Sequence, residues 1–257
     1  MMKVILEVKE RHKPTLPIEA ECITPKNFLD PERVFHVWKG NKELDISEVF
    51  HVRKDGNAKS ADQVEIIIRG DSSNIKRVGE YMDGGRILIE GSIGMHCGNF
   101  MSAGTIEIKG DADSWLGREM HGGTILCHGN VEDYAGSGYR GEKKGMTGGR
   151  IEIMGNAGDF AAETMAGGEM IIHGNAGDMP GIDIKDGSLT IMGDCSRPCG
   201  NMSGGKCWIF GTAYDMLPTF RNEGQTSVDS VPVTRFSGDY ISRGLGMVYT
   251  ANHKYME

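Results

Sequence analysis

MTGGRIEIMGNAGD at residues 146–159 is followed by MAGGEMIIHGNAGD at residues 165–178 and by IKDGSLTIMGD at residues 184–194. The same phrase therefore returns every 19 residues. A period of this length indicates a solenoid, in which each unit buries its apolar face by stacking on the next unit. The glycine that closes each phrase extends the series in both directions. The closing glycines are Gly70, Gly91, Gly110, Gly129, Gly155, Gly174, Gly193 and Gly211.

One step of the repeat is longer than the others. The spacings between closing glycines are 21, 19, 19, 26, 19, 19 and 18 residues. The long step carries the insert SGYRGEKKG at residues 137–145. Inserts in a solenoid form loops on one side, which is often a binding side. A solvated bulge is the alternative, and the sequence does not decide between the two.

Apolar residues stand four and two positions before each closing glycine, and a polar residue stands directly before the first of them in every unit. This alternation predicts a short strand in each unit, with two side chains facing inward. A further inward column, nine positions before the glycine, holds mostly methionine. Asn or Asp follows most of the closing glycines and can hydrogen-bond locally or up a ladder of coils. The two strand columns are Ile66, Ile87, Ile106, Ile125, Ile151, Met170, Leu189 and Cys207, and Ile68, Ile89, Ile108, Cys127, Ile153, Ile172, Ile191 and Ile209.

These columns predict an all-β fold, a parallel β-helix with coils of about 19 residues over residues 61–211. A right-handed helix is favoured because the strict hexapeptide repeat of the left-handed type is absent. Residues 1–60 are expected to form a strand-rich N-terminal cap, with a strand at residues 3–9 and a strand or short helix at residues 46–52. Residues 212–257 are expected to form a C-terminal cap and an arm that lies along the rod or on a partner. Both caps would cover open sheet ends.

The composition excludes several classes of function. The net charge of −8 disfavours a nucleic-acid partner, which requires a basic stripe. No apolar run approaches the length that spans a membrane, and the first residues are too charged for a signal peptide. A cytoplasmic location is therefore expected, and the 6 cysteines would then be free thiols.

No pattern of catalytic or metal-binding residues emerges from the sequence. Cys195, Cys199 and Cys207 lack the spacing of zinc or iron–sulfur sites, so we expect buried, inert thiols. His128 and His173 share an outward column but lie two coils apart. Four aspartates recur four positions after the closing glycine, where Asp suits a repeated turn better than general acid–base chemistry. They are Asp133, Asp159, Asp178 and Asp215. We therefore predict no catalytic, cofactor-binding or metal-binding residue in this chain.

Outward strand positions become apolar toward the last coils. Contiguous apolar surface of this kind usually marks a protein interface. The alternative is that the C-terminal tail folds back over it. The predicted subunit interface comprises Leu126, Met154, Ile171, Met192, Trp208 and Phe210 on the strands, with Tyr139 and Arg140 in the insert.

Two phrases carry a resemblance to a known family. GNVEDYAGSGYRGEKKGMTGG at residues 129–149 and GGEMIIHGNAGDMPG at residues 167–181 resemble the C subunit of the formylmethanofuran dehydrogenases. The glycine columns are also similar to the GXGXG β-helix of the glutamate synthase C-terminal domain. The insert favours the dehydrogenase subunit. The resemblance covers most of the chain and is strongest over residues 82–211.

The resemblance implies a complex that reduces CO2 in methanogenesis at a tungsten- or molybdenum-pterin site in another subunit. An amidohydrolase-like subunit with a binuclear metal site would join the formate to methanofuran, and ferredoxin-like subunits would carry iron–sulfur clusters. This chain would be a scaffold without catalytic residues or cofactor. The nearest alternative is the C subunit of a bacterial formyltransferase/hydrolase complex, which lacks the CO2-reducing step. An alternative of another class is a free-standing β-helix hydrolase.

Overall fold

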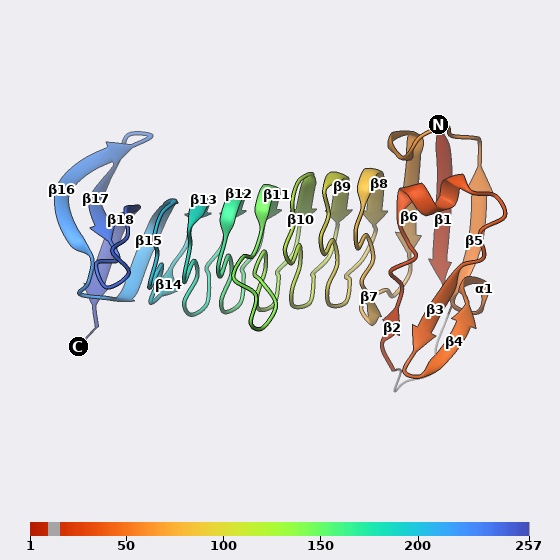
Figure 1. Cartoon of the computed structure of the whole chain (residues 1–257), viewed down its shortest axis with the longest axis horizontal. Helices are drawn as coiled ribbons and strands as arrows, with labels where there is room; N and C mark the ends of the chain where they lie inside the picture. Colours follow the sequence, from red (N-terminus) through yellow and green to blue (C-terminus); the bar gives the residue numbers. More distant parts are fainter. Residues whose placement is uncertain (10–15, 257) are drawn as a thin grey trace.

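The computed structural model describes residues 1–9 and 16–256. The chain forms an all-β rod in which successive coils lie side by side, and larger strands cover the two ends (Figure 1). This solenoid-like arrangement agrees with the class of fold predicted from the repeat. Among the described residues, no helix has both the length and the apolar character needed to cross a membrane.

Each coil contributes one strand to a long sheet and pairs in parallel with the coils on either side. Ile66 lies opposite Ile87, and Ile87 lies opposite Ile106. Residues at equal positions of the repeat are therefore direct neighbours along the rod. The coil strands are β6 (Val64–Arg69), β8 (Asp83–Ile89), β9 (Ala103–Ile108), β10 (Thr124–Cys127), β11 (Thr147–Ile153), β12 (Ala166–Ile172), β13 (Asp186–Ile191) and β15 (Lys206–Met216).

The interior of the rod is built from columns of like residues. Both strand columns predicted to face inward are buried, with no member more than 1% exposed, which confirms that prediction. The methionine column is buried as well, at 0% for Met82, Met101 and Met120. A further buried column arises just after the closing glycines, where Ile93, Ala112 and Val131 form isolated parallel bridges.

One corner of each coil has an unusual backbone. In most coils three alternate residues of this corner take positive φ, as in His96 (66°), Gly98 (71°) and Phe100 (54°). The N–H groups of His96 and Phe100 donate to the next coil, whereas that of Gly98 donates to the preceding coil. A Cβ on Gly98 would lie 2.6 Å from Cδ1 of Ile125, so glycine fits this inner position. The other two residues project their side chains outward from the corner.

The Asn and Asp residues after the closing glycines form a ladder along the rod. Oδ1 of Asn130 accepts from the N–H of Asn156, and Oδ1 of Asn156 accepts from the N–H of Asn175. The Asn175 amide oxygen accepts from Asp194 in the same way. Each side chain thus satisfies a backbone donor of the next coil, as the sequence predicted.

The N-terminal segment covers the first coil. Strand β1 (Met2–Val8) pairs in parallel with β6 and antiparallel with β5 (Phe50–Asp55). Residues 46–52, for which the sequence left a strand or a helix open, divide between α1 (Ile46–Val49) and β5. A smaller sheet is made of β4 (Lys42–Asp45), β3 (His36–Lys39), β2 (Ile18–Glu19) and β7 (Ile75–Lys76). Two 3-10 helices, η1 (Pro25–Leu29) and η2 (Ala61–Gln63), pack beside β8.

The C-terminal segment extends the sheet, which differs from the arm expected from the sequence. Strand β15 continues past Gly211 and pairs with the short β14 (Cys195–Ser196). Beyond it, β18 (Gly246–Tyr255) adds in parallel, followed by β17 (Val231–Gly238) and β16 (Arg221–Val228) in antiparallel order. Backbone pairing to the last coil holds the tail at the end of the rod (Figure 1).

The close approach of coils gives a matched pair of glycine variants. A Cβ on Gly122 would lie 2.3 Å from the carbonyl oxygen of Ser102, whereas a Cβ on Gly91 would lie 3.4 Å from its nearest neighbour, the carbonyl oxygen of Gly70. Neither glycine has positive φ, so the two differ in packing and not in backbone freedom. We expect Gly122→Ala to destabilise the fold by about 1–3 kcal/mol and Gly91→Ala to have a much smaller effect. Urea unfolding of both variants measures this, and equal midpoints would contradict it.

Candidate functional site

The residues of the predicted interface fall on two separate surfaces. Leu126, Ile171, Trp208 and Phe210 lie in strands of the long sheet, and Met154 and Met192 directly follow β11 and β13. The insert residues lie at the corner where positive φ recurs. Leu126 is set apart from the others because its neighbours in register are Glu107 and Glu152. Ile171 follows on the other side of Glu152, and its next neighbour in register is Thr190. The contiguous apolar surface is therefore smaller than the sequence suggested.

The apolar part of the outer sheet face lies over β11 to β15, and we call it the apolar sheet face. Met154 and Met192 are 43% and 45% exposed. Trp208 stacks on Tyr249 of β18, with ring centroids 5.8 Å apart. The tail therefore adds an aromatic residue beside this face and leaves the two methionines uncovered. The apolar sheet face consists of Met154, Ile171, Met192, Trp208 and Phe210.

The outer face over the earlier coils is charged instead. The Glu107 carboxylate accepts hydrogen bonds from Lys109, from Arg86 at 2.6 Å and from the His128 ring at 3.1 Å. These contacts, with Lys109 the largest contributor, lower the pKa of Glu107 to about 2. In a later coil the His173 ring and Arg150 lower the pKa of Glu152 in the same way. His128 and His173 thus serve as partners of carboxylates on adjacent strands.

An aromatic ladder runs along the positive-φ corner, which the sequence analysis missed. His96, Trp115, Tyr134 and Phe160 stack in series with centroid distances of 5.2, 4.8 and 5.1 Å. Tyr81 and Phe100 form a parallel pair at 4.8 Å. The sequence contains a signal for this ladder, because its four residues all stand five positions after a closing glycine.

The insert folds back against this ladder. The Tyr139 ring lies 5.8 Å from Trp115 and 6.3 Å from His96, both of which belong to earlier coils. The guanidinium of Arg118 lies over Tyr139 at 4.9 Å and over Phe100 at 4.6 Å. Arg140 lines a smaller neighbouring cavity of about 140 Å³, beside Trp115. The insert therefore forms part of a surface pocket and is not a free bulge.

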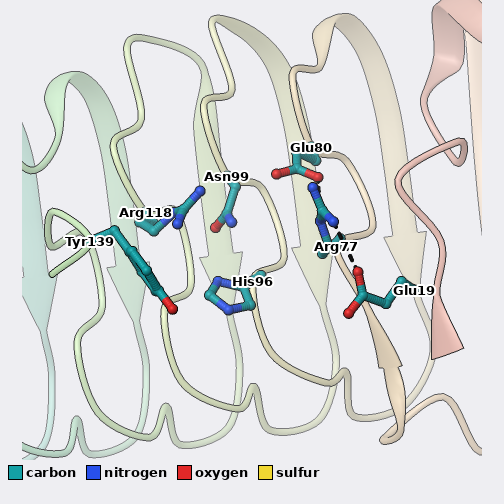
Figure 2. Close-up of a pocket in the computed structure, with 7 residues that line it drawn as sticks. All are labelled: Glu19, Arg77, Glu80, His96, Asn99, Arg118 and Tyr139. Atoms are coloured by element: carbon teal, nitrogen blue, oxygen red, sulfur yellow. Dashed lines mark hydrogen bonds and ion pairs between the residues drawn. The ribbon is translucent and has the colours of Figure 1, made fainter. Parts of the chain in front are cut away.

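The surface pocket that Tyr139 and Arg118 line has a volume of about 250 Å³, and its lining is polar (Figure 2). Arg77 occupies one side, where its guanidinium pairs with Glu80 at 2.6 Å and with Glu19 at 2.9 Å. Arg118, Asn99 and His96 lie together on the opposite side (Figure 2). The lining residues are Glu19, Arg77, Glu80, His96, Asn99, Arg118 and Tyr139.

Asn99 holds the second side of the pocket in place. Its side chain is buried at 1% exposure. With the amide oriented so that both of its ends have partners, the oxygen faces Nε of Arg118 at 3.3 Å and Nδ1 of His96 at 3.2 Å. Its amide nitrogen donates to the carbonyl oxygens of His96 and Trp115. Burial and the nearby Arg118 lower the pKa of His96 to about 4. The imidazole is therefore neutral near pH 7.

Comparison with known proteins gives the family. Over 92% of its length, the chain is 47% identical to the C subunit of a tungsten-containing formylmethanofuran dehydrogenase from Methanococcus maripaludis, and the match covers 93% of that relative. The chain belongs to the family of formylmethanofuran dehydrogenase C subunits. The corresponding subunit of a molybdenum-containing formylmethanofuran dehydrogenase from Methanosarcina barkeri is 42% identical, over 32% of this chain and 28% of that relative. No protein-family model matches the chain.

A solved structure supports the fold of this family member. A chain in the crystal structure of the formyltransferase/hydrolase complex from Methylorubrum extorquens, determined with methylofuran, aligns with a TM-score of 0.84. The alignment covers 96% of this chain and 98% of that one, at 24% identity. At this identity the likeness extends to the fold alone.

Three of the four recurring aspartates of this family member have structural partners. Oδ1 of Asp133 accepts from the N–H of Asp159, and Oδ1 of Asp159 accepts from the N–H of Asp178. Asp178 in turn pairs with Arg197. Within residues 1–9 and 16–256, no group of three or more His, Cys, Asp and Glu side chains is arranged to hold a metal ion. The five buried cysteines include Cys195, Cys199 and Cys207.

His96 makes stability depend on pH in a defined window. Its pKa is about 4 in the folded chain, compared with 6.5 for an unperturbed histidine. Between these values the unfolded chain binds more protons, so stability is full above about pH 6.5 and is lost as the pH falls toward 4. We expect His96→Phe, which keeps an aromatic ring stacked on Trp115, to reduce the loss of folding stability between pH 6.5 and 4.5. Urea unfolding across this range measures it, with His51→Phe on exposed β5 as the control. An unchanged slope would contradict the assignment.

Proposed function

We propose that this chain is the structural, non-catalytic C subunit of a formylmethanofuran dehydrogenase complex. The observation that carries the proposal is the match to the Methanococcus maripaludis subunit, because it extends over nearly the whole of both chains. The complex would reduce CO2 and form formylmethanofuran in methanogenesis. In this proposal the chain acts in the cytoplasm, holds no cofactor and has neither a nucleic-acid nor a membrane partner.

The regular architecture supports a scaffolding role. Successive coils pair in register over β6 to β15, which makes a stiff element with side chains at fixed intervals. Asp133 and Asp159, which a β-helix hydrolase could use as catalytic carboxylates, accept backbone N–H groups of adjacent coils. We also propose that the solenoid is a right-handed parallel β-helix of the GXGXG type, in line with the handedness preferred by parallel crossovers.

The partners would supply the chemistry. In this proposal, tungsten- or molybdenum-pterin, iron–sulfur clusters and a binuclear metal site belong to pterin-metal, ferredoxin-like and amidohydrolase-like subunits. The apolar sheet face would be one docking surface for them, since exposed apolar patches usually mark interfaces. A bacterial formyltransferase/hydrolase complex is the second candidate, because a chain of such a complex shares this fold over its whole length.

Purification of the native assembly through a tag on this chain tests the proposal and separates the candidates. We expect iron–sulfur proteins and either tungsten or molybdenum to co-purify in stoichiometric amounts, as measured by metal analysis and peptide mass spectrometry. Zinc without any of these would favour the hydrolase complex. The isolated chain should show no CO2 reduction or formyl transfer. An unaccompanied monomer, or turnover by the isolated chain, would contradict the scaffold proposal.

Docking through the apolar sheet face can be tested with two equally exposed methionines. Met192 on this face and Met256 near the C-terminus are both 45% exposed. We expect Met192→Lys to leave the monomer folded, as judged by circular dichroism and gel filtration, but to weaken assembly about tenfold or more, because it places a charge in an apolar interface. Met256→Lys should assemble normally. Wild-type assembly by Met192→Lys would rule out this face as the docking surface.

A further inference from the structure

Arg77 and Arg118 line the same pocket but differ in their counter-charges. Arg77 has two carboxylates within 3 Å, those of Glu80 and Glu19. Arg118 is more buried, with 14% of its side chain exposed compared with 35% for Arg77. Among the described residues, the carboxylate within 4 Å of Arg118 is that of Glu119, at 3.7 Å from Nε. Glu119 also accepts the backbone N–H of Tyr139 at 3.2 Å.

The partners of Arg118 leave its terminal nitrogens available. A guanidinium has five N–H donors. In the described part of the chain, Nε faces the Asn99 amide oxygen, and no acceptor lies within hydrogen-bond distance of either Nη. The ion pair with Glu119 lies at Nε and beyond hydrogen-bond distance, so it compensates the largely buried charge only in part. The two Nη groups are therefore open to an anion from outside the chain.

The surroundings hold the guanidinium in one orientation. The rings of Phe100 and Tyr139 lie over it at 4.6 and 4.9 Å, and Asn99 fixes Nε. An oriented guanidinium can bind a carboxylate through two parallel hydrogen bonds. Because its orientation is already fixed, the arginine side chain loses little further conformational entropy on binding. In Figure 2 the tips of Arg118 point from the Tyr139 side toward Asn99, at the edge of the pocket opposite Arg77.

We propose that this pocket binds a carboxylate on Arg118, supplied by an acidic side chain of an assembly partner. The assignment to a partner rests on the proposed function. Exposed aromatic residues surround the buried charge, since Tyr139 is 45% exposed and Tyr81, which stacks on Phe100, is 66% exposed. Buried arginines ringed by tyrosines are typical hot spots of protein interfaces. A volume of about 250 Å³ admits an Asp or Glu side chain.

The ligand chemistry can be tested on the full-length chain alone by nitrogen-15 NMR. The probes are sodium acetate and the peptide N-acetyl-Gly-Asp-Gly-amide, with sodium chloride at equal ionic strength and the Asn peptide as controls. We expect acetate and the Asp peptide to shift the Arg118 Nε–H signal and the Tyr139 amide in a saturable way. In Arg118→Gln, checked for folding by thermal unfolding, the Tyr139 response should weaken about tenfold or more. Arg118→Lys should give an intermediate affinity because it keeps the charge without the fork. Equal shifts with chloride, or an unchanged Tyr139 response in Arg118→Gln, would overturn the proposal.

The source of the carboxylate is tested in the assembled complex. Arg118→Gln in the tagged chain should lower the yield of co-purified subunits about tenfold in a 0.3 M salt wash. The matched control is Arg86→Gln, which removes an arginine from the charged outer sheet face, where it pairs with Glu107. Undiminished assembly of Arg118→Gln would overturn the assignment to a partner. If the wild-type chain retains no subunits, the proposed function fails, and the acetate titration still decides whether the pocket binds carboxylates.

Discussion

Backbone hydrogen bonding between adjacent coils is the constraint on which the rest of this structure depends. Each coil donates to and accepts from both neighbours, so a residue always lies beside its equivalent in the next coil. Neighbouring parallel strands are about 4.8 Å apart, which is also a favourable separation for stacked rings. Residues at the same position of the repeat therefore form a column along the rod, both in its interior and on its surface.

Columns outside the rod must avoid placing like charges side by side. Along the charged outer sheet face, Glu65 is followed in register by Arg86, and Glu107 lies within reach of both Arg86 and Lys109. Opposite charges on adjacent strands are favourable, whereas like charges directly opposite are not. The same rule operates further along the rod, where Arg150 lies between Glu152 and Glu169. Apolar residues also enter the outer columns of the later coils, where Met154 and Met192 are exposed and available to a partner.

The functional features arise where the repeat is interrupted. The insert lengthens one coil and brings Tyr139 back over Trp115 and His96, which closes one side of the polar pocket. The buried Asn99 links His96 and Arg118 across two coils. The coils before the insert supply Arg77, Glu80, His96, Asn99 and Arg118, and the insert adds Tyr139. The insert, which departs from the period, thus completes a local site on the rod.

The sequence by itself determined the rod. Ile66 to Ile209 of the strand columns were identified as buried, and the ladder of Asn130, Asn156 and Asn175 was anticipated, because a residue in a solenoid contacts what the period places beside it. The ladder of His96, Trp115, Tyr134 and Phe160 could have been found from its offset after the closing glycines. The tertiary structure alone decided the path of the insert and the pairing of the tail with β15. The physical reason is that these contacts join residues at unequal positions of the repeat, and their geometry depends on three-dimensional packing that the period does not encode.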